Sequence, residues 1–299
     1  MSDGIPLSET APDGIVIIDK PQGLTSQAVV SRVRRALNVR KAGHAGTLDP
    51  MATGVLLVGV GRATRLLGYL AGHDKRYLAT IRLGQATTTD DAEGEPLGEP
   101  TSAVAISDSA ISEAITRFKG DIEQVPSTVS AIKVAGKRAY ALARAGESVA
   151  LASRTVTVTR FDLLARRDCA PYVDLDVDVE CGSGTYIRAL ARDLGAMLHV
   201  GGHLSALRRM RVGKFAVAQA SALDAVSAAD IVAMGQVAEQ VFPWVAVSQT
   251  DAAEVRFGRP LNLVVAADPT AILDADHSLL ALYRPDSRPG WSRPVAVFV

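Results

Sequence analysis

The segment from Lys41 to Val55, KAGHAGTLDPMATGV, places one carboxylate among residues that control the backbone. Its glycines can adopt conformations that other residues avoid, whereas Pro50 holds the preceding Asp49 in an extended conformation. Between residues 31 and 77 there are nine basic residues and two acidic ones, and Asp49 is one of the two. Surrounding positive charge predicts a carboxylate that stays ionised with a lowered pKa, which suits a nucleophile or a base.

A turn is the simpler interpretation of the same residues, because Asp-Pro and glycine are common in turns. The glycine spacing matches neither the phosphate-binding pattern GxxxxGK[ST] nor the dinucleotide fingerprint GxGxxG. Residue types and spacing therefore leave both a turn and a reactive carboxylate open.

Strands and single helices surround this segment. Hydrophobic periodicity predicts strands over residues 14–20, 54–61, 77–83, 154–164 and 172–180, and helices over 25–37, 111–118, 138–145 and 185–197, with a short helix ending near residue 70. We expect loops over 39–53 and 126–136, the latter possible as a hairpin, and an exposed loop over 85–101, which holds five acids and no base. Because strands and helices do not alternate regularly, the pattern favours a mixed α+β sheet over a doubly wound one.

Charge is unevenly distributed under a net charge of zero, which excludes a uniformly basic coat for nucleic acid. Residues 31–77 carry a net charge of +7, and residues 186–214, with six basic residues and one acid, carry +5. From residue 219 onward nine acids outnumber five arginines. The basic segments predict phosphate contacts by two groups of side chains, Arg32, Arg34 and Arg35 in one and Arg208, Arg209, Arg211 and Lys214 in the other.

Several other classes of protein and site are not expected. Two cysteines exclude a disulfide framework, and the first residues lack the pattern of a signal peptide. The longest apolar run, residues 54–61, is too short to cross a bilayer. Asp174, Asp176 and Asp178 alternate with apolar residues, as on the solvated face of a strand, and the histidines lack metal-ligand spacing. We therefore expect a cytoplasmic protein without a metal site.

Four motifs occur in order between about Gly14 and Phe215: GIVIIDKPQGLTS, GHAGTLDPMATGVLLV, HDKRY and GSGTYIRALARDLG. Together they closely resemble the bacterial TruB-type tRNA pseudouridine-55 synthases. The resemblance implies the pseudouridine synthase fold, a mixed, largely antiparallel central sheet with flanking helices. It also implies a small β-rich, PUA-like C-terminal domain, consistent with strand-like runs at 261–265, 271–273, 279–283 and 295–299. We expect a flexible tail over 1–12, a catalytic domain over 13–245 and the C-terminal domain over 246–299.

The same resemblance implies that Asp49 is the catalytic aspartate. Five more residues match positions around the target base: His44 contacts the RNA near the extruded base, Tyr77 stacks on the uracil, Tyr186 is an active-site tyrosine, Arg188 pairs with the aspartate, and Leu207 packs near the base. These roles fit a flipped nucleotide, which regains stacking on an aromatic face. Residues 126–144 resemble an insertion that closes over the T-loop.

The implied reaction isomerises uridine to pseudouridine at position 55 in the T-loop of tRNA, without redox change or hydrolysis and so without a cofactor. The implied partner is the T-arm of tRNA, with no obligate protein partner and a monomeric enzyme. Asp49 can attack C6, attack C1′ or remove a ribose proton, and the sequence leaves all three open. The alternative is a non-catalytic RNA-binding or tRNA-folding chaperone, and the presence of Asp49, Tyr77 and Arg188 argues against it.

Overall fold

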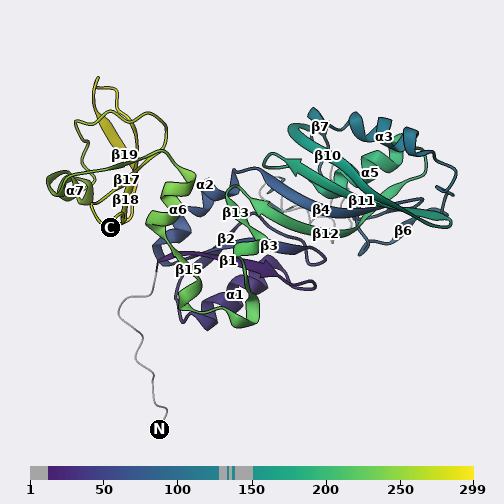
Figure 1. Cartoon of the computed structure of the whole chain (residues 1–299), viewed down its shortest axis with the longest axis horizontal. Helices are drawn as coiled ribbons and strands as arrows, with labels where there is room; N and C mark the ends of the chain where they lie inside the picture. The colour runs from purple at the N-terminus through teal and green to yellow at the C-terminus, as the bar shows by residue number, and fades with distance from the viewer. Residues whose placement is uncertain (1–12, 128–132, 135–136, 139–150) are drawn as a thin grey trace, which may run out of the picture.

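The computed structural model describes residues 13–127, 133–134, 137–138 and 151–299. One large sheet forms its centre in the order β14-β1-β3-β12-β4-β11-β10-β7, with β2, β13 and β15 paired alongside (Figure 1). Its strands are β1 (Gly14–Lys20), β2 (Ala42–Ala45), β3 (Thr53–Val60), β4 (Lys75–Leu83), β7 (Gly120–Gln124), β10 (Arg154–Cys169), β11 (Tyr172–Cys181), β12 (Gly202–Val212), β13 (Phe215–Ala216), β14 (Ser221–Ala222) and β15 (Ile231–Ala233).

Most neighbouring strands of this sheet are antiparallel, but β12 pairs with β3 and β1 pairs with β14 in parallel. The parallel contact sets Gly54 opposite Arg209. Gly54 has a φ of +98°, and a Cβ added there would lie 2.2 Å from the Arg209 carbonyl oxygen, so this crossing requires glycine. The mixed, largely antiparallel sheet with flanking helices confirms the predicted α+β fold.

Five α-helices accompany the central sheet or connect it to the next one within the described residues: α1 (Ser26–Ala36), α2 (Leu67–Ala71), α3 (Asp108–Thr116), α5 (Ile187–Met197) and α6 (Met234–Val241). Short 3₁₀ turns follow at η1 (Gly61–Arg65), η2 (Val217–Gln219), η3 (Leu223–Ala225) and η4 (Ala228–Asp230). Helix α1 begins as predicted, because the Thr25 side chain accepts a hydrogen bond from the Ala28 amide. Among the described residues, no helix is both long and apolar enough to cross a membrane.

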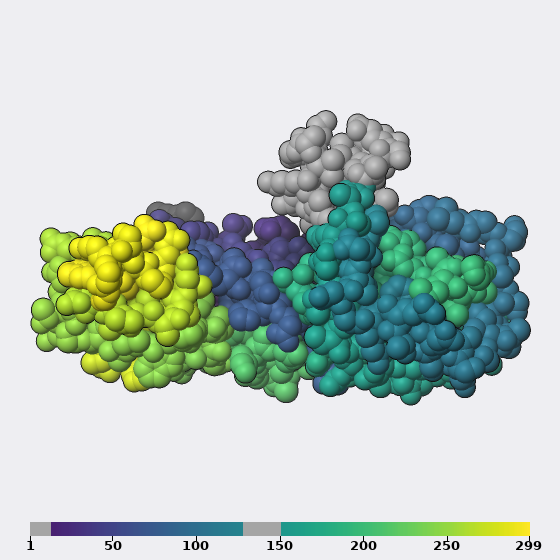
Figure 2. Space-filling model, turned by 90° about the horizontal axis from the view of Figure 1, so that it is seen from above, coloured from purple at the N-terminus to yellow at the C-terminus, as the bar shows by residue number. Residues whose placement is uncertain are grey.

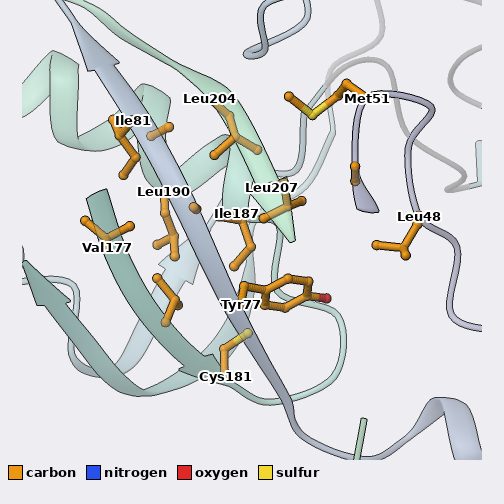
Figure 3. Packing of buried hydrophobic residues seen from close by; sticks show 14 of the residues in the cluster. Leu48, Met51, Tyr77, Ile81, Val177, Cys181, Ile187, Leu190, Leu204 and Leu207 are labelled. Atoms are coloured by element: carbon orange, nitrogen blue, oxygen red, sulfur yellow. The ribbon is translucent and has the colours of Figure 1, made fainter. Parts of the chain in front are cut away.

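The hydrophobic core lies on both faces of the sheet near β1, where Val16 and Ile18 join one buried cluster and Ile15 and Ile17 join another. Figure 3 shows part of the first cluster, in which the Tyr77 ring extends from β4 toward the loop that carries Leu48. The packed sheet is thus the rigid support for this loop.

Two loop predictions were wrong in part. Residues 39–53 contain the short strand β2. Residues 85–101 form a small hairpin, β5 (Ala86–Thr87) with β6 (Pro96–Leu97), and its Gln85, Thr87, Asp90 and Asp91 are buried rather than exposed. Burial is possible because their polar groups find partners; the Gln85 amide, for example, donates to the carbonyl oxygens of residues 86, 97 and 98.

The alternation in β11 is present as predicted, but its aspartates do not form a fully solvated face. Asp174 and Asp178 are buried, and each accepts two hydrogen bonds from an arginine of β4, Arg82 and Arg76 respectively. These cross-strand ion pairs cover the carboxylates. The predicted hairpin at 126–136 is represented by β8 (Lys133–Val134) paired with β9 (Lys137–Arg138), and the predicted helix over 138–145 lies outside the described residues except for Arg138.

The C-terminal residues form a second sheet in the order β16-β17-β18-β19, comprising β16 (Trp244–Ala246), β17 (Thr270–Leu273), β18 (Leu279–Pro285) and β19 (Ser292–Val297). This confirms a C-terminal β domain. The strand predicted at 261–265 is absent, since there only Leu261 forms a bridge, to Ser292. Helix α7 (Gln249–Arg256) was not predicted, because it buries only Ala252 and Val255 and has too little apolar periodicity.

The C-terminal sheet, at one end of the elongated molecule in Figure 2, shares a core with the rest of the chain. Leu273, Leu279 and Phe298 pack in one cluster with Leu66 and Leu70. Nearby, Arg62 donates to the Phe298 carbonyl oxygen and Arg65 to that of residue 297. These two arginines of the basic segment 31–77 therefore hold the last strand.

Candidate functional site

A cavity of about 270 Å³ lies between the loop before β3, strand β4, the start of α5 and strand β12. It brings together five of the six predicted site residues from four distant parts of the sequence. Its wall consists of Gly46, Thr47, Leu48, Asp49, Ala71, Lys75, Tyr77, Arg154, Gly184, Thr185, Tyr186, Ile187, Arg188, Leu207 and Arg209. The sixth residue, His44, lies on β2 opposite Val58 and outside this wall.

The Asp49 carboxylate is bound at both oxygens by Arg188, with Nε 3.0 Å from Oδ2 and Nη2 3.2 Å from Oδ1. Arg188 is the second residue of α5, and its side chain is only 5% exposed, whereas 35% of the Asp49 side chain remains exposed. A planar guanidinium holds a carboxylate in one orientation through two such bonds. The pair therefore presents an oriented carboxylate to the cavity.

Two partners that the sequence analysis missed bind the far side of this arginine. Arg188 Nη1 donates to the Thr89 carbonyl oxygen at 3.0 Å and lies 3.3 Å from Asp91 Oδ2. Asp91 is also fixed, because its Oδ1 accepts hydrogen bonds from the Thr89 hydroxyl and the amide of residue 93. The acidic run at 85–101 was the only sequence signal for Asp91, and it was interpreted as solvent-exposed.

Lys20 is a third functional candidate that the sequence analysis missed. It ends β1, is fully buried, and its ammonium donates to the carbonyl oxygens of Pro21, Leu24 and Pro50. Burial lowers the pKa of Lys20 to about 8, against the opposing charge of Asp49. Lys20 thus holds the residue next to Asp49 and adds positive charge beneath the cavity.

The electrostatics of Asp49 differ from the prediction. Burial raises the pKa of the carboxyl, and the neighbouring Asp91 raises it further, while Arg188 and Lys20 lower it. The predicted lowered pKa was wrong, because removal from water outweighs the positive charges that the sequence places nearby. A carboxylate with a raised pKa is a stronger base, which suits proton transfer as well as nucleophilic attack.

The apolar side of the cavity is formed by Tyr77 of β4 and Leu207 of β12, which are 6% and 8% exposed (Figure 3). Burial raises the pKa of the Tyr77 hydroxyl against the positive charge of Arg209, so this group keeps its proton. The Tyr77 ring is thus held at the cavity wall, where it can offer part of its surface to a flat ligand.

Tyr186 stands at the entry of α5, where the buried Gln124 binds its backbone at both the amide and the carbonyl. The Arg154 guanidinium lies 5.0 Å from the centre of the Tyr186 ring. Tyr186 therefore joins the end of β7, the start of β10 and the helix that carries Arg188.

Among the predicted phosphate-binding residues of β12 and the turn after it, the prediction is wrong for Arg209, and Arg208 and Arg211 have partners within the protein. Arg209 is 1% exposed and donates to the carbonyl oxygens of Val55 and Gly46, so it holds the Asp49 loop from inside. Arg208 pairs with Asp19, and Arg211 pairs with Asp74 and Glu180. The sequence analysis counted their charges but could not see these internal partners. Lys214 is exposed.

The basic group on α1 differs, because Arg32, Arg34 and Arg35 are all exposed. Arg32 lies 3.6 Å from Asp224, and within the described residues no ion pair involves Arg34 or Arg35. No group of three His, Cys, Asp or Glu side chains in the described part of the chain is placed to bind a metal ion. The cavity can hold a flat, uncharged ligand beside the oriented Asp49 carboxylate. The exposed arginines of α1 add positive charge elsewhere on the surface.

Three family models match the chain in succession. Residues 34–187 match the N-terminal domain of the TruB family of pseudouridylate synthases, residues 188–248 the C-terminal domain of tRNA pseudouridylate synthase B, and residues 242–299 the C-terminal model of tRNA pseudouridine synthase II.

Curated relatives are similar over nearly the whole length. A protein of Cutibacterium acnes named tRNA pseudouridine synthase B is 54% identical over 97% of this chain and 99% of its own length. A Nocardia farcinica protein of the same name is 55% identical over 90% of this chain and 88% of its own.

Solved structures share the fold at lower identity. A chain from the crystal structure of a Cbf5-Nop10-Gar1 complex superposes with a TM-score of 0.73 at 26% identity, covering 99% of this chain and 88% of that one. A chain from an H/ACA RNP bound to a substrate RNA containing 2′-deoxyuridine superposes with a TM-score of 0.70 at 25% identity, covering 96% of this chain and 85% of that one. With these matches added to the cavity around Asp49, the chain belongs to the TruB family and is a pseudouridine synthase.

Proposed function

We propose that this chain converts uridine to pseudouridine at position 55 in the T-loop of tRNA, with Asp49 as its essential catalytic residue. The observation that carries the proposal is the Asp49 carboxylate, oriented by buried Arg188 at the wall of a cavity that Tyr77 also lines. The family supports the reaction, and the name shared by the relatives supports tRNA as the substrate.

In the proposed reaction the target uridine leaves its stack and enters the cavity, where the Tyr77 face replaces part of the lost stacking. The bond between N1 and C1′ breaks, the uracil turns, and C5 forms the new bond to C1′. The proton on C5 leaves for solvent and N1 takes up a proton, so the base stays neutral and no electron is gained or lost. Asp49 acts in its ionised form, and Arg188 orients the Asp49 carboxylate toward the ribose and base.

We assign the remaining site residues roles that are compatible with their places in the fold. Leu207 packs beside the base, since it lines the same cavity as the oriented carboxylate. Tyr186 lies at the mouth of α5 and contacts the nucleotide there. His44, on β2 ahead of the catalytic loop, contacts the RNA outside the cavity, next to the extruded base.

We propose a separation of tasks between two domains. In this proposal residues 13–245 carry the chemistry, and residues 246–299, PUA-like, add affinity for tRNA without taking part in the chemical step. The enzyme acts as a monomer in the cytoplasm, with the T-arm as its partner and without a protein subunit.

Tritium release from a T-arm transcript labelled with [5-³H]uridine tests the proposal. We expect the unmodified chain to release tritium from this transcript, and a matched transcript with cytidine at position 55 to give only background. Asp49→Asn should lose about 10⁴-fold or more of the rate, about 5.5 kcal/mol of barrier, and still bind the RNA.

Three outcomes contradict the proposal. No release by the unmodified chain with tight binding would favour a non-catalytic RNA-binding protein. Equal release from both transcripts would remove the assignment to position 55. Turnover by Asp49→Asn within tenfold of the parent would remove the assignment of the aspartate.

A further inference from the structure

Helix α5 presents two arginines one turn apart, Arg188 and Arg192, toward two consecutive aspartates of the 85–101 hairpin. Arg188 Nη1 lies 3.3 Å from Asp91 Oδ2, and Arg192 Nη1 lies 3.0 Å from Asp90 Oδ2. Both aspartates are buried, with side chains 12% exposed at Asp90 and 5% at Asp91. Two parallel ion pairs thus join this hairpin to the helix that carries the active-site arginine.

The backbone at Asp90 makes this double contact possible. Consecutive residues of an extended chain point to opposite sides, but Asp90 has a φ of 61°, in the left-handed region, and both carboxylates reach α5. Among residues with a side chain, only Asn, Asp and His occur there with any frequency, and Gly is the least strained. Asn or Gly would satisfy the backbone equally well, so the need for a carboxylate at Asp90 comes from its partner.

Arg192, the partner of Asp90, connects α5 with the 85–101 hairpin and with the residue after β7. Arg192 Nη2 donates to the Val125 carbonyl oxygen at 2.8 Å, directly after β7, and Arg192 Nε donates to Asp193 at 2.8 Å. The hairpin is held from its other side by β12, where the Leu204 amide donates to the Asp90 carbonyl oxygen. The position of the Asp90 backbone therefore depends on Arg192 and β12 together.

The position of the Asp90 backbone affects Arg188 and Asp49 through the two residues next to Asp90 in the sequence. Thr89 supplies the carbonyl oxygen and Asp91 the carboxylate that bind the far side of Arg188, and Arg188 orients Asp49. In the described part of the chain the cavity wall includes neither Asp90 nor Arg192. A change in either residue can thus move Arg188 without removing a side chain from the cavity wall.

We propose that Asp90 and Arg192 form a positioning pair, which sets the 89–91 backbone so that Arg188 holds Asp49 in its reactive orientation. This inference rests on the proposed role of Asp49 and Arg188. The bland alternative is an ion pair that only stabilises the fold. The two differ in what they change, because a positioning pair alters the chemical step in a protein that remains folded and binds RNA normally.

The test compares Asp90→Asn, which keeps the left-handed backbone preference and the side-chain size, with Arg192→Gln. We expect each to lower the single-turnover rate at saturating T-arm transcript by about 10-fold to 10²-fold, as small misplacements of catalytic groups do. The dissociation constant for RNA should change less than threefold. If the pair acts as a unit, the double variant should be no slower than the slower single variant.

Asp193→Asn is the matched control, since it removes the other ion pair of Arg192 and leaves the hairpin untouched. A loss of rate with Asp193→Asn equal to that with Asp90→Asn would contradict the proposal, as would rates within threefold of the parent in both pair variants. A crystal structure of Asp90→Asn gives a readout that needs no activity. We expect Arg188 to be displaced from Asp49, and an unmoved contact would overturn the inference.

These outcomes are separable from the failure of the proposed function. An inactive parent chain would remove the proposed reaction, and the crystal structure would still decide whether the pair positions Arg188. An active parent with unaffected pair variants would leave the proposed reaction standing and remove only the positioning pair.

Discussion

Arg188 lies between two carboxylates: Asp49, which faces the cavity, and Asp91, which is buried behind it. The guanidinium uses separate nitrogens for the two partners, Nε and Nη2 for Asp49 and Nη1 for Asp91. A fork with nitrogens in a fixed plane is needed to satisfy both at once.

Arg188→Lys is therefore expected to be far from conservative. Lysine retains one positive charge but cannot reach both carboxylates in this geometry, so Asp49 loses its fixed orientation. We expect the single-turnover rate to fall by about 10²-fold or more while RNA affinity changes little. Quench-flow measurement of tritium release checks the single-turnover rate, and filter binding checks RNA affinity. A normal rate would place Arg188 outside the reacting site.

Asp49→Asn should make the folded protein more stable at neutral pH. The pKa of Asp49 is raised on folding, so its favourable contribution is present below the unfolded value of about 3.9 and is lost as pH rises through the higher folded value. At neutral pH the ionised carboxylate is thus a cost that asparagine removes, and Arg188 keeps Asp91 as a partner. Thermal denaturation should show a higher Tm for the variant than for the parent at pH 7.5, and this difference in Tm should narrow toward pH 4. A gap that widens in acid would contradict the raised pKa.

Gly54→Ala should disrupt the parallel pairing of β3 with β12. The new methyl group would meet the Arg209 backbone, and the residue would keep an unfavourable positive φ. We expect a loss of about 3 kcal/mol or more in the free energy of unfolding. Gly68→Ala is the control, because nothing lies within 4 Å of that position in α2, and it should be neutral or stabilising by about 0.5–1 kcal/mol. Urea titration measures both, and equal midpoints for the two variants would refute this account.

RNA binding should depend on salt mainly through α1. Because several basic residues of the two positive segments have partners within the protein, we expect the exposed Arg34 and Arg35 to supply much of the phosphate contact. Replacing each with alanine should reduce the slope of log K against log salt by about 1. Arg65→Ala is the control, since Arg65 binds the last strand and should lower stability without altering the slope. Slopes that respond only to Arg65→Ala would refute the assignment.

Local signals explain what the sequence could predict. Thr25 and the spacing of Val29, Val30 and Val33 define α1, and the alternation of residues 173–179 defines β11, because capping and periodicity act within a few residues. The Asp49–Arg188 pair was expected through the resemblance, since the two residues lie far apart in the sequence.

Partners that depend on the folded sheet could not be predicted in this way. Asp91 and Arg209 are charged residues in charged segments, and sequence reasoning places such residues in solvent. Their burial follows from contacts with Arg188 and with the Val55 and Gly46 carbonyls, which only the assembled sheet brings within reach. The same contacts explain why counting charges included the buried Arg209 among the phosphate-binding residues.

The pairing of β1 has a consequence for synthesis on the ribosome. This strand emerges well before β14 and β15, which pair with its other edge and are translated some two hundred residues later. Until then β1 and β3 expose an unpaired edge and an unfilled core face, a state prone to aggregate. Such non-local pairing also slows folding. We therefore expect chains halted before β15 to need a chaperone, and the nascent chain to reach its native fold only after β15 has been translated.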